Sequence, residues 1–233
     1  MKKKILFILF LFIFIGTVNA KTCIYENKVG VEMDCNLYNS LKEYYTENFL
    51  DYMPQNEYNQ IKNNNPEDIE VETITPIRGS YYGTTYKEIR IVRNGSFITV
   101  SLVWLNNPVT RSYEVFAIRL TSGVSINGSV NFRQYSDNNG NGIVSTNCSK
   151  KTFSNGVGVS FKLSVYNNLE SYITFNYTGS GTIYSSYQHA ITGVTLTQSK
   201  KYTLSSSGYG GTTLFDNSVS GYYDGMSGVN LSV

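Results

Sequence analysis

Hydrophobic and polar residues alternate most regularly between positions 86 and 120, and this stretch predicts three β-strands. In the middle strand, Phe97 to Leu105, every second residue is apolar, which is the period of a strand that buries one face of its sheet. The dipeptide Asn94-Gly95 separates it from a first strand, Lys87 to Arg93, and is typical of the type I′ turn of a β-hairpin. A proline-containing break then precedes a third expected strand, Ser112 to Leu120, because proline cannot donate to a strand ladder.

Short candidate strands separated by turn residues continue to the end of the chain. Their length and spacing are typical of β-sandwich proteins. They are Asp68 to Thr75, Ser129 to Tyr135, Gly142 to Thr146, Val157 to Tyr166, Ser171 to Tyr177, Thr182 to Tyr187, Gly193 to Thr197, Tyr202 to Ser206, Thr212 to Phe215 and Gly228 to Val233. We therefore expect a mainly β domain over residues 67 to 233, either an antiparallel β-sandwich or a jelly-roll-like structure.

Residues 21 to 66 have a different pattern. Cys23 and Cys35 flank a polar segment, which predicts a hairpin closed by a disulfide in an oxidising compartment. The sequence leaves open whether Cys148 pairs with one of them or is a buried free thiol. From Leu37 to Ile61 apolar residues recur every three or four positions, the spacing of amphipathic helices, and a proline divides the stretch. The expected N-terminal segment is thus a cysteine hairpin followed by two short helices.

The first 20 residues predict an export signal. Three lysines at positions 2 to 4 precede an unbroken apolar run, Ile5 to Ile15, and small residues lead to Ala20, as a signal peptidase requires. The run is shorter than the roughly 20 residues that span a bilayer, and no second run of this kind follows. We expect cleavage after Ala20 and a secreted protein without a stable membrane span. The abundance of Asn, Lys, Ile and Tyr is typical of bacteria with AT-rich genomes.

Charge is distributed unevenly along the chain. Without the three leader lysines, 16 basic and 17 acidic residues remain, which excludes a generally basic protein that coats nucleic acid. Residues 21 to 75 hold 11 acidic and 4 basic residues, whereas residues 76 to 233 hold 6 acidic and 12 basic ones. Either the acidic segment docks on the basic domain, or the basic domain contacts an anionic polymer such as a cell-wall glycan or teichoic acid.

One loop matches the first half of a calcium-binding loop. Asp137, Asn139 and Asn141 occupy its first, third and fifth positions, and Gly142 occupies the sixth, where a sharp turn is needed. The twelfth position is Cys148 instead of a bidentate glutamate, so a Ca²⁺ ion would bind weakly. The alternative is a plain Asn/Gly turn. No other cofactor is indicated.

Three residues could form a nucleophilic site. Cys148, His189 and Asp216 follow one another in the order of a transglutaminase-like triad, in which a thiolate attacks, a histidine acts as base and a carboxylate orients the histidine. His189 is the only histidine of the chain, so a histidine-rich zinc site is excluded. The competing interpretation of His189 is a hydrogen-bonded structural residue.

A second catalytic hypothesis concerns alternating acidic residues. On a strand, Asp68, Glu70 and Glu72 would project their carboxylates from one face. Jelly-roll glycanases resemble this arrangement, and a glycosidase needs two carboxyl groups beside the scissile bond. The competing interpretation is an exposed polar strand face.

Tyrosines are the candidate ligand contacts. A tyrosine ring packs against a sugar or a protein while its hydroxyl stays hydrated. The six candidates are Tyr81, Tyr82, Tyr184, Tyr187, Tyr222 and Tyr223. Tyrosine pairs packed between strands are the alternative, and Trp104 is expected in the core because it lies on the apolar strand face.

Taken together, the sequence favours a secreted, non-enzymatic β-sandwich protein that binds a glycan, an anionic cell-surface polymer or a host surface protein. An exported hydrolase is the first alternative. A membrane-inserting toxin or adhesin is the second, because the strands between Thr152 and Ser199 are rich in Ser, Thr and Gly and carry little charge. No long part of the chain resembles a family of known activity.

Overall fold

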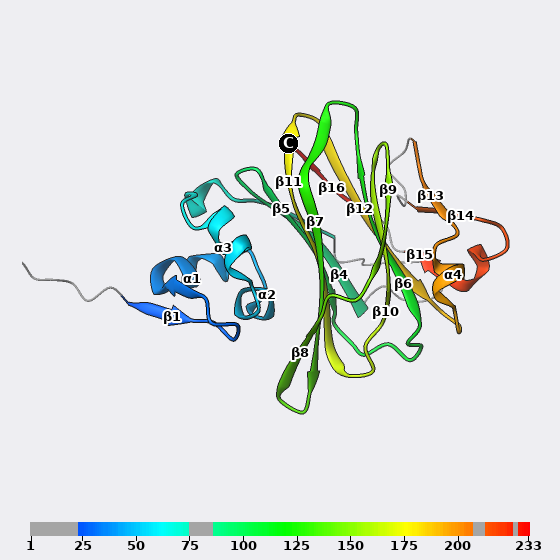
Figure 1. Ribbon diagram of the computed structural model, residues 1–233, viewed down its shortest axis with the longest axis horizontal. Helices are drawn as coiled ribbons and strands as arrows, with labels where there is room; N and C mark the ends of the chain where they lie inside the picture. Colours follow the sequence, from blue (N-terminus) through cyan, green and yellow to red (C-terminus); the bar gives the residue numbers. More distant parts are fainter. Residues whose placement is uncertain (1–22, 75–85, 207–212, 226–227) are drawn as a thin grey trace, which may run out of the picture.

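Two six-stranded antiparallel sheets form a sandwich, as the alternation of apolar residues predicts (Figure 1). The computed structural model describes residues 23–74, 86–206, 213–225 and 228–233. The predicted leader peptide, Tyr81 and Tyr82 lie outside the described residues. Within these ranges no helix is both long enough and apolar enough to cross a membrane.

The first sheet has the strand order β3-β4-β5-β11-β7-β8. Its strands are β3 (Glu70–Ile74), β4 (Lys87–Asn94), β5 (Phe97–Trp104), β7 (Val124–Asn138), β8 (Asn141–Ser145) and β11 (Asn167–Gly179). Ile91, Val100, Ile173 and Phe132 lie side by side across four of these strands. All four are buried in the core between the sheets.

The second sheet has the order β15-β12-β6-β10-β9, and β16 also pairs with β12. Its strands are β6 (Tyr113–Leu120), β9 (Ser149–Phe153), β10 (Gly156–Lys162), β12 (Thr182–Ala190), β15 (Tyr223–Gly225) and β16 (Val229–Ser232). Val159, Phe116 and Tyr187 form a row across it and belong to the same core. Burial of each large apolar side chain contributes about 1.5 to 3 kcal/mol.

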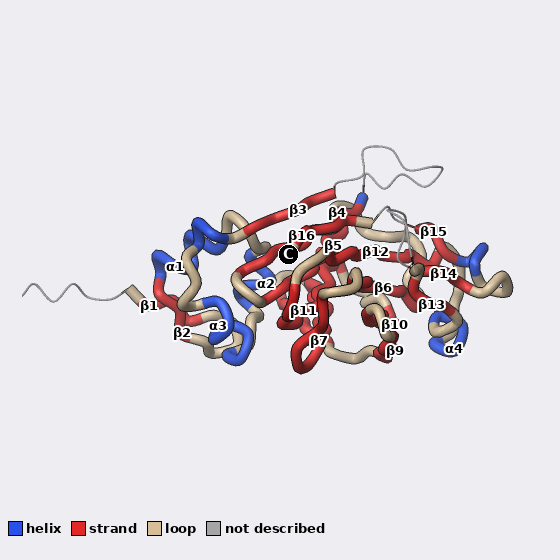
Figure 2. Tube along the Cα trace, turned by 90° about the horizontal axis from the view of Figure 1, so that it is seen from above, coloured by secondary structure: helices blue, strands red, loops and turns tan. Residues whose placement is uncertain are grey.

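The N-terminal segment, residues 23 to 68 and called the head from here on, covers the outer face of the first sheet (Figures 1 and 2). It contains β1 (Ile24–Glu26), β2 (Glu32–Asp34), α1 (Cys35–Leu41), α2 (Glu47–Asp51), α3 (Gln55–Ile61) and the 3-10 turn η1 (Pro66–Asp68). The predicted disulfide between Cys23 and Cys35 is confirmed. Apolar side chains of the head pack against Val92, Phe97 and Tyr172 of the sheet.

A smaller layer covers the outer face of the second sheet. It contains α4 (Leu196–Ser199), the hairpin of β13 (Tyr202–Leu204) and β14 (Thr213–Phe215), and the 3-10 turn η3 (Ser220–Tyr222). Tyr202 packs against Val115 and Ala117 of β6. Position 158 must be glycine here, because a Cβ would lie 2.1 Å from the hydroxyl oxygen of Tyr202. Both outer faces of the sandwich are therefore covered (Figure 2).

The predicted hairpin of β4 and β5 is present, but its turn differs from the prediction. Asn94 pairs with Phe97, so the turn residues are Gly95 and Ser96. Of these two only Gly95 has a positive φ, 62°, which is the pattern of a type II′ turn. Asn94 remains in the strand because it is buried and its side-chain oxygen accepts a hydrogen bond from Asn64 of the head, at 2.7 Å.

Two further elements differ from the prediction. The head contains three α-helices instead of two, because the Thr46 side chain caps a separate helix, α2. The predicted strand from Gly193 to Thr197 is wrong, because Thr195 and Gln198 form a capping box that starts α4. A local hydrogen-bond pattern thus outweighs the apolar residues in that stretch.

Candidate functional site

A pocket of about 540 Å³ opens at one end of the sandwich, where strands of both sheets meet. Strand register brings two pairs of side chains to it: Lys87 lies opposite Trp104 on β4 and β5, and His189 lies opposite Asp224 on β12 and β15. The crossover from β5 to β6, residues 105 to 112, lines part of the pocket and includes the predicted proline-containing break. Residues that are far apart in the sequence therefore line one cavity.

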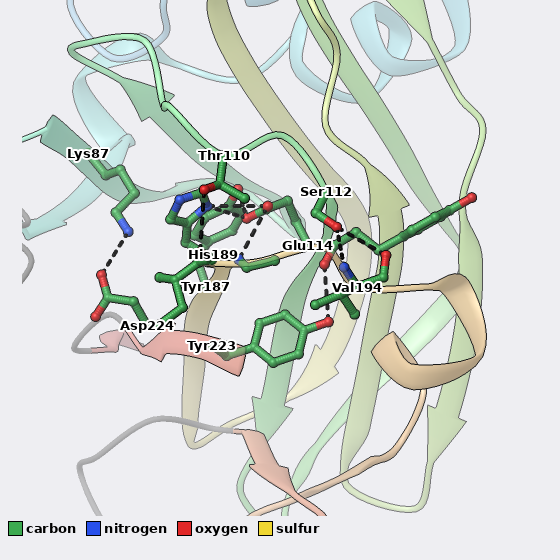
Figure 3. Close-up of polar contacts among 12 residues, drawn as sticks. Lys87, Thr110, Ser112, Glu114, Tyr187, His189, Val194, Tyr223 and Asp224 are labelled. Atoms are coloured by element: carbon green, nitrogen blue, oxygen red, sulfur yellow. Dashed lines mark hydrogen bonds and ion pairs between the residues drawn. The ribbon is translucent and has the colours of Figure 1, made fainter. Parts of the chain in front are cut away.

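Lys87 is the buried charge of this pocket, with a side chain that is 3% exposed. Its Nζ atom lies 5.0 Å from the centre of the Trp104 ring and 5.7 Å from that of Tyr187. The distance to Asp224 Oδ2 is 3.7 Å, longer than a direct hydrogen bond (Figure 3). Burial lowers the pKa of Lys87, and the negative charges of Asp224 and Glu114 partly oppose that shift. The ammonium group therefore keeps donors for a ligand.

A buried carboxylate orients His189. Its Nδ1 atom lies 3.0 Å from Glu114 Oε2 (Figure 3). Glu114 is fully buried and also accepts hydrogen bonds from the Tyr187 hydroxyl, at 2.7 Å, and from the Ala190 N–H, at 3.3 Å. Burial, together with the charge of Glu114, raises the pKa of Tyr187. In the neutral imidazole, a proton on Nδ1 faces this carboxylate, and Nε2 is then a hydrogen-bond acceptor.

Exposed apolar residues gather around the mouth of the pocket. Tyr86 is 48% exposed, Leu105 49%, Val109 100% and Ile191 36%. At the end of the crossover, the Arg111 guanidinium donates hydrogen bonds to the backbone carbonyls of Ser164 and Tyr166. Contiguous exposed apolar residues on a folded domain are characteristic of a binding surface.

The structure does not assemble the predicted triad. Cys148 directly precedes β9, and His189 lies on β12. Strands β10 and β6 lie between β9 and β12, so β9 and β12 are three strand spacings, about 14 Å, apart. Asp216 follows β14, where its backbone N–H donates to Lys201, and Glu114 occupies the place beside the histidine. Burial raises the pKa of the Cys148 thiol, the opposite of what a thiolate nucleophile requires.

The three alternating acids do not share a strand face. Asp68 ends the 3-10 turn η1, which begins because Asn65 caps it and is followed by proline. Glu70 begins β3 and forms an ion pair with Arg93 on β4. The backbone of Glu72 lies in β3, but its side chain is outside the described part of the structure. The prediction of one row of carboxylates is therefore wrong for Asp68.

Asp137, Asn139 and Asn141 lie at the tight turn between β7 and β8, whose two turn residues are Asn139 and Gly140. Asn139 and Gly140 have φ values of 53° and 86°, the positive values of a type I′ turn. The Asp137 carboxylate accepts hydrogen bonds from the Gly140 N–H, at 2.7 Å, and from the Asn168 side chain, at 3.2 Å. No group of three or more His, Cys, Asp or Glu side chains that could hold a metal occurs among the described residues. This geometry is that of the plain Asn/Gly turn.

Two of the tyrosines proposed as ligand contacts are buried. Tyr187 is 0% exposed, so its prediction as a surface contact is wrong. Tyr223 is 9% exposed, its hydroxyl donates to the Tyr113 carbonyl, and its ring stacks on Phe215 with centroids 4.2 Å apart. The burial of Tyr187 could have been anticipated, because a spacing of three residues places Tyr184 and Tyr187 on opposite faces of one strand.

The other two described tyrosines remain partly accessible. The Tyr184 ring is half-buried on the outer face of the second sheet, 3.9 Å from the Arg119 guanidinium and remote from the pocket. Tyr222 is 37% exposed, and its backbone carbonyl accepts a hydrogen bond from the Ile191 N–H at the pocket rim. Of the four described candidates, Tyr222 alone lies exposed beside the pocket.

The chain is weakly similar to solved structures of bacterial proteins. No family model matches the chain, and no curated protein matches it. Solved structures similar to it include the KRT10-binding region domain of the pneumococcal serine rich repeat protein PsrP, at 14% identity over 52% of this chain and 84% of that chain, with a TM-score of 0.31. Another similar structure is described in connection with pH-induced modulation of Streptococcus parasanguinis adhesion by Fap1 fimbriae. It matches at 15% identity over 71% of this chain and 94% of that chain, also with a TM-score of 0.31. At such values neither similarity carries a conclusion about the ligand of this protein.

Proposed function

We propose that this protein is an exported, non-enzymatic binding domain that holds a glycan in the pocket at the end of the sandwich. The observation that carries the proposal is the combination of an exposed tyrosine, Tyr86, with buried Lys87 and partly buried Asp224 in one cavity. A sugar presents an apolar C–H face and hydroxyl groups that both donate and accept. The pocket offers partners for each.

The size and surroundings of the pocket agree with this function. Its volume of about 540 Å³ lies within the range of sites for small ligands, roughly 300 to 1,000 Å³. The exposed side chains of Val109 and Ile191 line the pocket. They supply an apolar surface for the molecule that carries the sugar.

The arrangement of carboxylates favours binding over hydrolysis. Glycosidases place two carboxyl groups beside the scissile bond. Among the described residues that line the pocket, Asp224 is the one carboxylate. Glu114 lies behind His189 and is already bonded to three donors. This supports an adhesin-like role in which the ligand is held and not cleaved.

The proposal is tested with the secreted chain, residues 21 to 233, on an array of bacterial and host glycans. We expect Tyr86→Ser to lower the affinity for a retained glycan about two- to tenfold, since stacking on an aromatic ring contributes about 0.5 to 1.5 kcal/mol. Leu214→Ser is the matched control, because Leu214 is 55% exposed in the layer on the other sheet. Retention of no glycan, or equal retention by both variants, would contradict the proposal.

A further inference from the structure

We infer that the pocket selects an uncharged sugar by two adjacent hydroxyl groups, one bridging Lys87 and Asp224 and the other donating to His189. This inference rests on the proposed function and specifies its ligand. It starts from a buried ammonium group that has more donors than the described protein atoms satisfy. It departs from the expectation of an anionic polymer, which followed from the basic composition of residues 76 to 233.

The separation of Lys87 and Asp224 suits a bridging hydroxyl. Their Nζ and Oδ2 atoms are 3.7 Å apart, too far for a direct hydrogen bond. A hydroxyl oxygen about 2.8 Å from each atom can accept from the ammonium and donate to the carboxylate at the same time. Both hydrogen bonds involve a charged partner, and such bonds are stronger than those between neutral groups.

The second contact follows from strand register. His189 and Asp224 are directly opposite one another on paired strands, so their side chains start about 5 Å apart on the same face. Nδ1 of His189 faces Glu114, so in the neutral imidazole with its proton on Nδ1 the remaining nitrogen, Nε2, accepts. Two acceptors side by side, with an ammonium next to one of them, match two neighbouring hydroxyls of a sugar ring.

The charges around the pocket favour an uncharged ligand. Lys87 is the one lysine or arginine that lines it within the described residues, while Asp224 lines it and Glu114 lies directly behind His189. Both carboxylates favour the charged form of Lys87 and so oppose the lowering of its pKa by burial. A sugar carboxylate or sulfate would therefore enter a site whose positive charge is already balanced, and an unpaired buried charge is costly.

Among the described residues that line the pocket, Tyr86 is the exposed aromatic side chain. Trp104 is 8% exposed, with Lys87 over its ring and His189 against it, the ring centroids of Trp104 and His189 being 4.9 Å apart. Trp104 therefore shapes the wall and fixes the two polar side chains. Tyr86 is 48% exposed and offers its ring to the C–H face of the sugar.

The experiment titrates the secreted chain with methyl glycosides of neutral hexoses, with the matching uronic acid glycosides, and with deoxy analogues that lack one ring hydroxyl. We expect one neutral glycoside to bind at least tenfold more tightly than its uronic acid partner. Removal of one of two adjacent hydroxyls should weaken binding about tenfold or more. The affinity should change little between low and physiological salt, because no net charge is neutralised.

Variants then locate the contacts. Asp224→Asn and Lys87→Met should each lower the affinity for the neutral glycoside about tenfold or more, and Leu214→Ser should leave it unchanged. Asp224→Asn keeps the shape of the side chain, and far-ultraviolet circular dichroism confirms the fold of each variant. If Lys87→Met fails to fold, Asp224→Asn and the deoxy analogues decide.

The outcomes separate this inference from the function on which it rests. Tighter binding of the uronic acid glycosides, lost in Lys87→Met, would overturn the choice of an uncharged sugar and retain the pocket as the site. Equal loss of affinity for all deoxy analogues would overturn the contact with two adjacent hydroxyls. Glycan binding that none of the variants at positions 86, 87 and 224 changes would overturn both proposals.

Discussion

The guanidinium group of Arg133 on β7 and the carboxylate of Glu57 on α3 form an ion pair whose side chains are 8% and 2% exposed. Glu57 also accepts a hydrogen bond from the Thr174 hydroxyl of β11, at 2.9 Å. A second basic residue of the first sheet, Arg90, donates to the backbone carbonyl of Tyr44 in the head, at 3.1 Å. These contacts support docking of the acidic segment on the basic domain, the first of the two explanations for the uneven charge.

Replacement of one partner of the Arg133 and Glu57 pair should destabilise the protein strongly. Arg133→Met leaves the Glu57 carboxylate buried without its cation, which costs about 3 to 5 kcal/mol of unfolding free energy. Urea unfolding measures this loss. The double variant Glu57→Gln with Arg133→Met should recover most of it, because no uncompensated charge remains.

The control for this prediction is the exposed ion pair of Lys42 and Glu47, whose side chains are 36% and 69% exposed. Lys42→Met should change the unfolding free energy by less than about 1 kcal/mol, as for other solvent-exposed pairs. Equal losses for Arg133→Met and Lys42→Met would show that the buried pair does not hold the head on the sheet.

Tyr187→Phe should weaken the support of His189. The variant removes the hydroxyl that donates to Glu114 and leaves a fully buried carboxylate with one donor fewer. We expect a loss of about 1 to 3 kcal/mol of unfolding free energy, measured in urea. Tyr222→Phe removes an exposed hydroxyl and should stay within about 0.5 kcal/mol of the parent protein. A Tyr187→Phe protein as stable as Tyr222→Phe would contradict this account of Glu114.

The disulfide should stabilise the head by lowering the conformational entropy of the unfolded chain. Cys23 and Cys35 are 12 positions apart, and a loop of this length contributes about 3 kcal/mol in the chain-entropy model. The variant with serine at both positions should lose about that much, and reductant should destabilise the parent protein but not the variant. Cys148→Ser, which replaces a free cysteine, is the control. Equal sensitivity of parent and double variant to reductant would contradict the prediction.

The alternation of residues such as Ile98, Val100 and Leu102 made the sandwich predictable, because a period of two is a direct consequence of strand geometry. It could not assign strands to sheets. The strand Tyr113–Leu120 follows β5 in the chain, yet it pairs with β10 and β12 in the other sheet. Its pattern would be the same in either sheet, so only the packing of the whole domain decides.

Of the polar residues at the candidate site, the sequence singled out His189 and gave no sign of the others. His189 stood out because it is the only histidine, but Glu114, its partner, lies 75 positions earlier. Lysine side chains are almost always solvent-exposed, so nothing in the sequence near Lys87 indicated a buried ammonium. Residues joined by strand register across two sheets leave no local pattern, which is why the pocket emerged only from the fold.

The burial of Lys87 makes a final prediction about stability. Its pKa is lowered from 10.5 mainly because the charged form loses its hydration inside the protein. The unfolded chain therefore holds this proton more tightly than the folded protein does. Charged Lys87 destabilises the fold below its folded-state pKa, and this cost disappears as the pH rises from that pKa towards 10.5.

Lys87→Met, which has a similar shape and no charge, should therefore be at least as stable as the parent protein at neutral pH while it loses ligand affinity. The parent protein should gain stability relative to the variant as the pH approaches 10.5. Tyrosines also titrate in this pH range, but they are present in both proteins, so the difference between the two urea unfolding curves reports on Lys87. A variant much less stable than the parent at neutral pH would show that the contact with Asp224 is structural. A gain in stability with a loss of binding is the result expected of a residue retained for function.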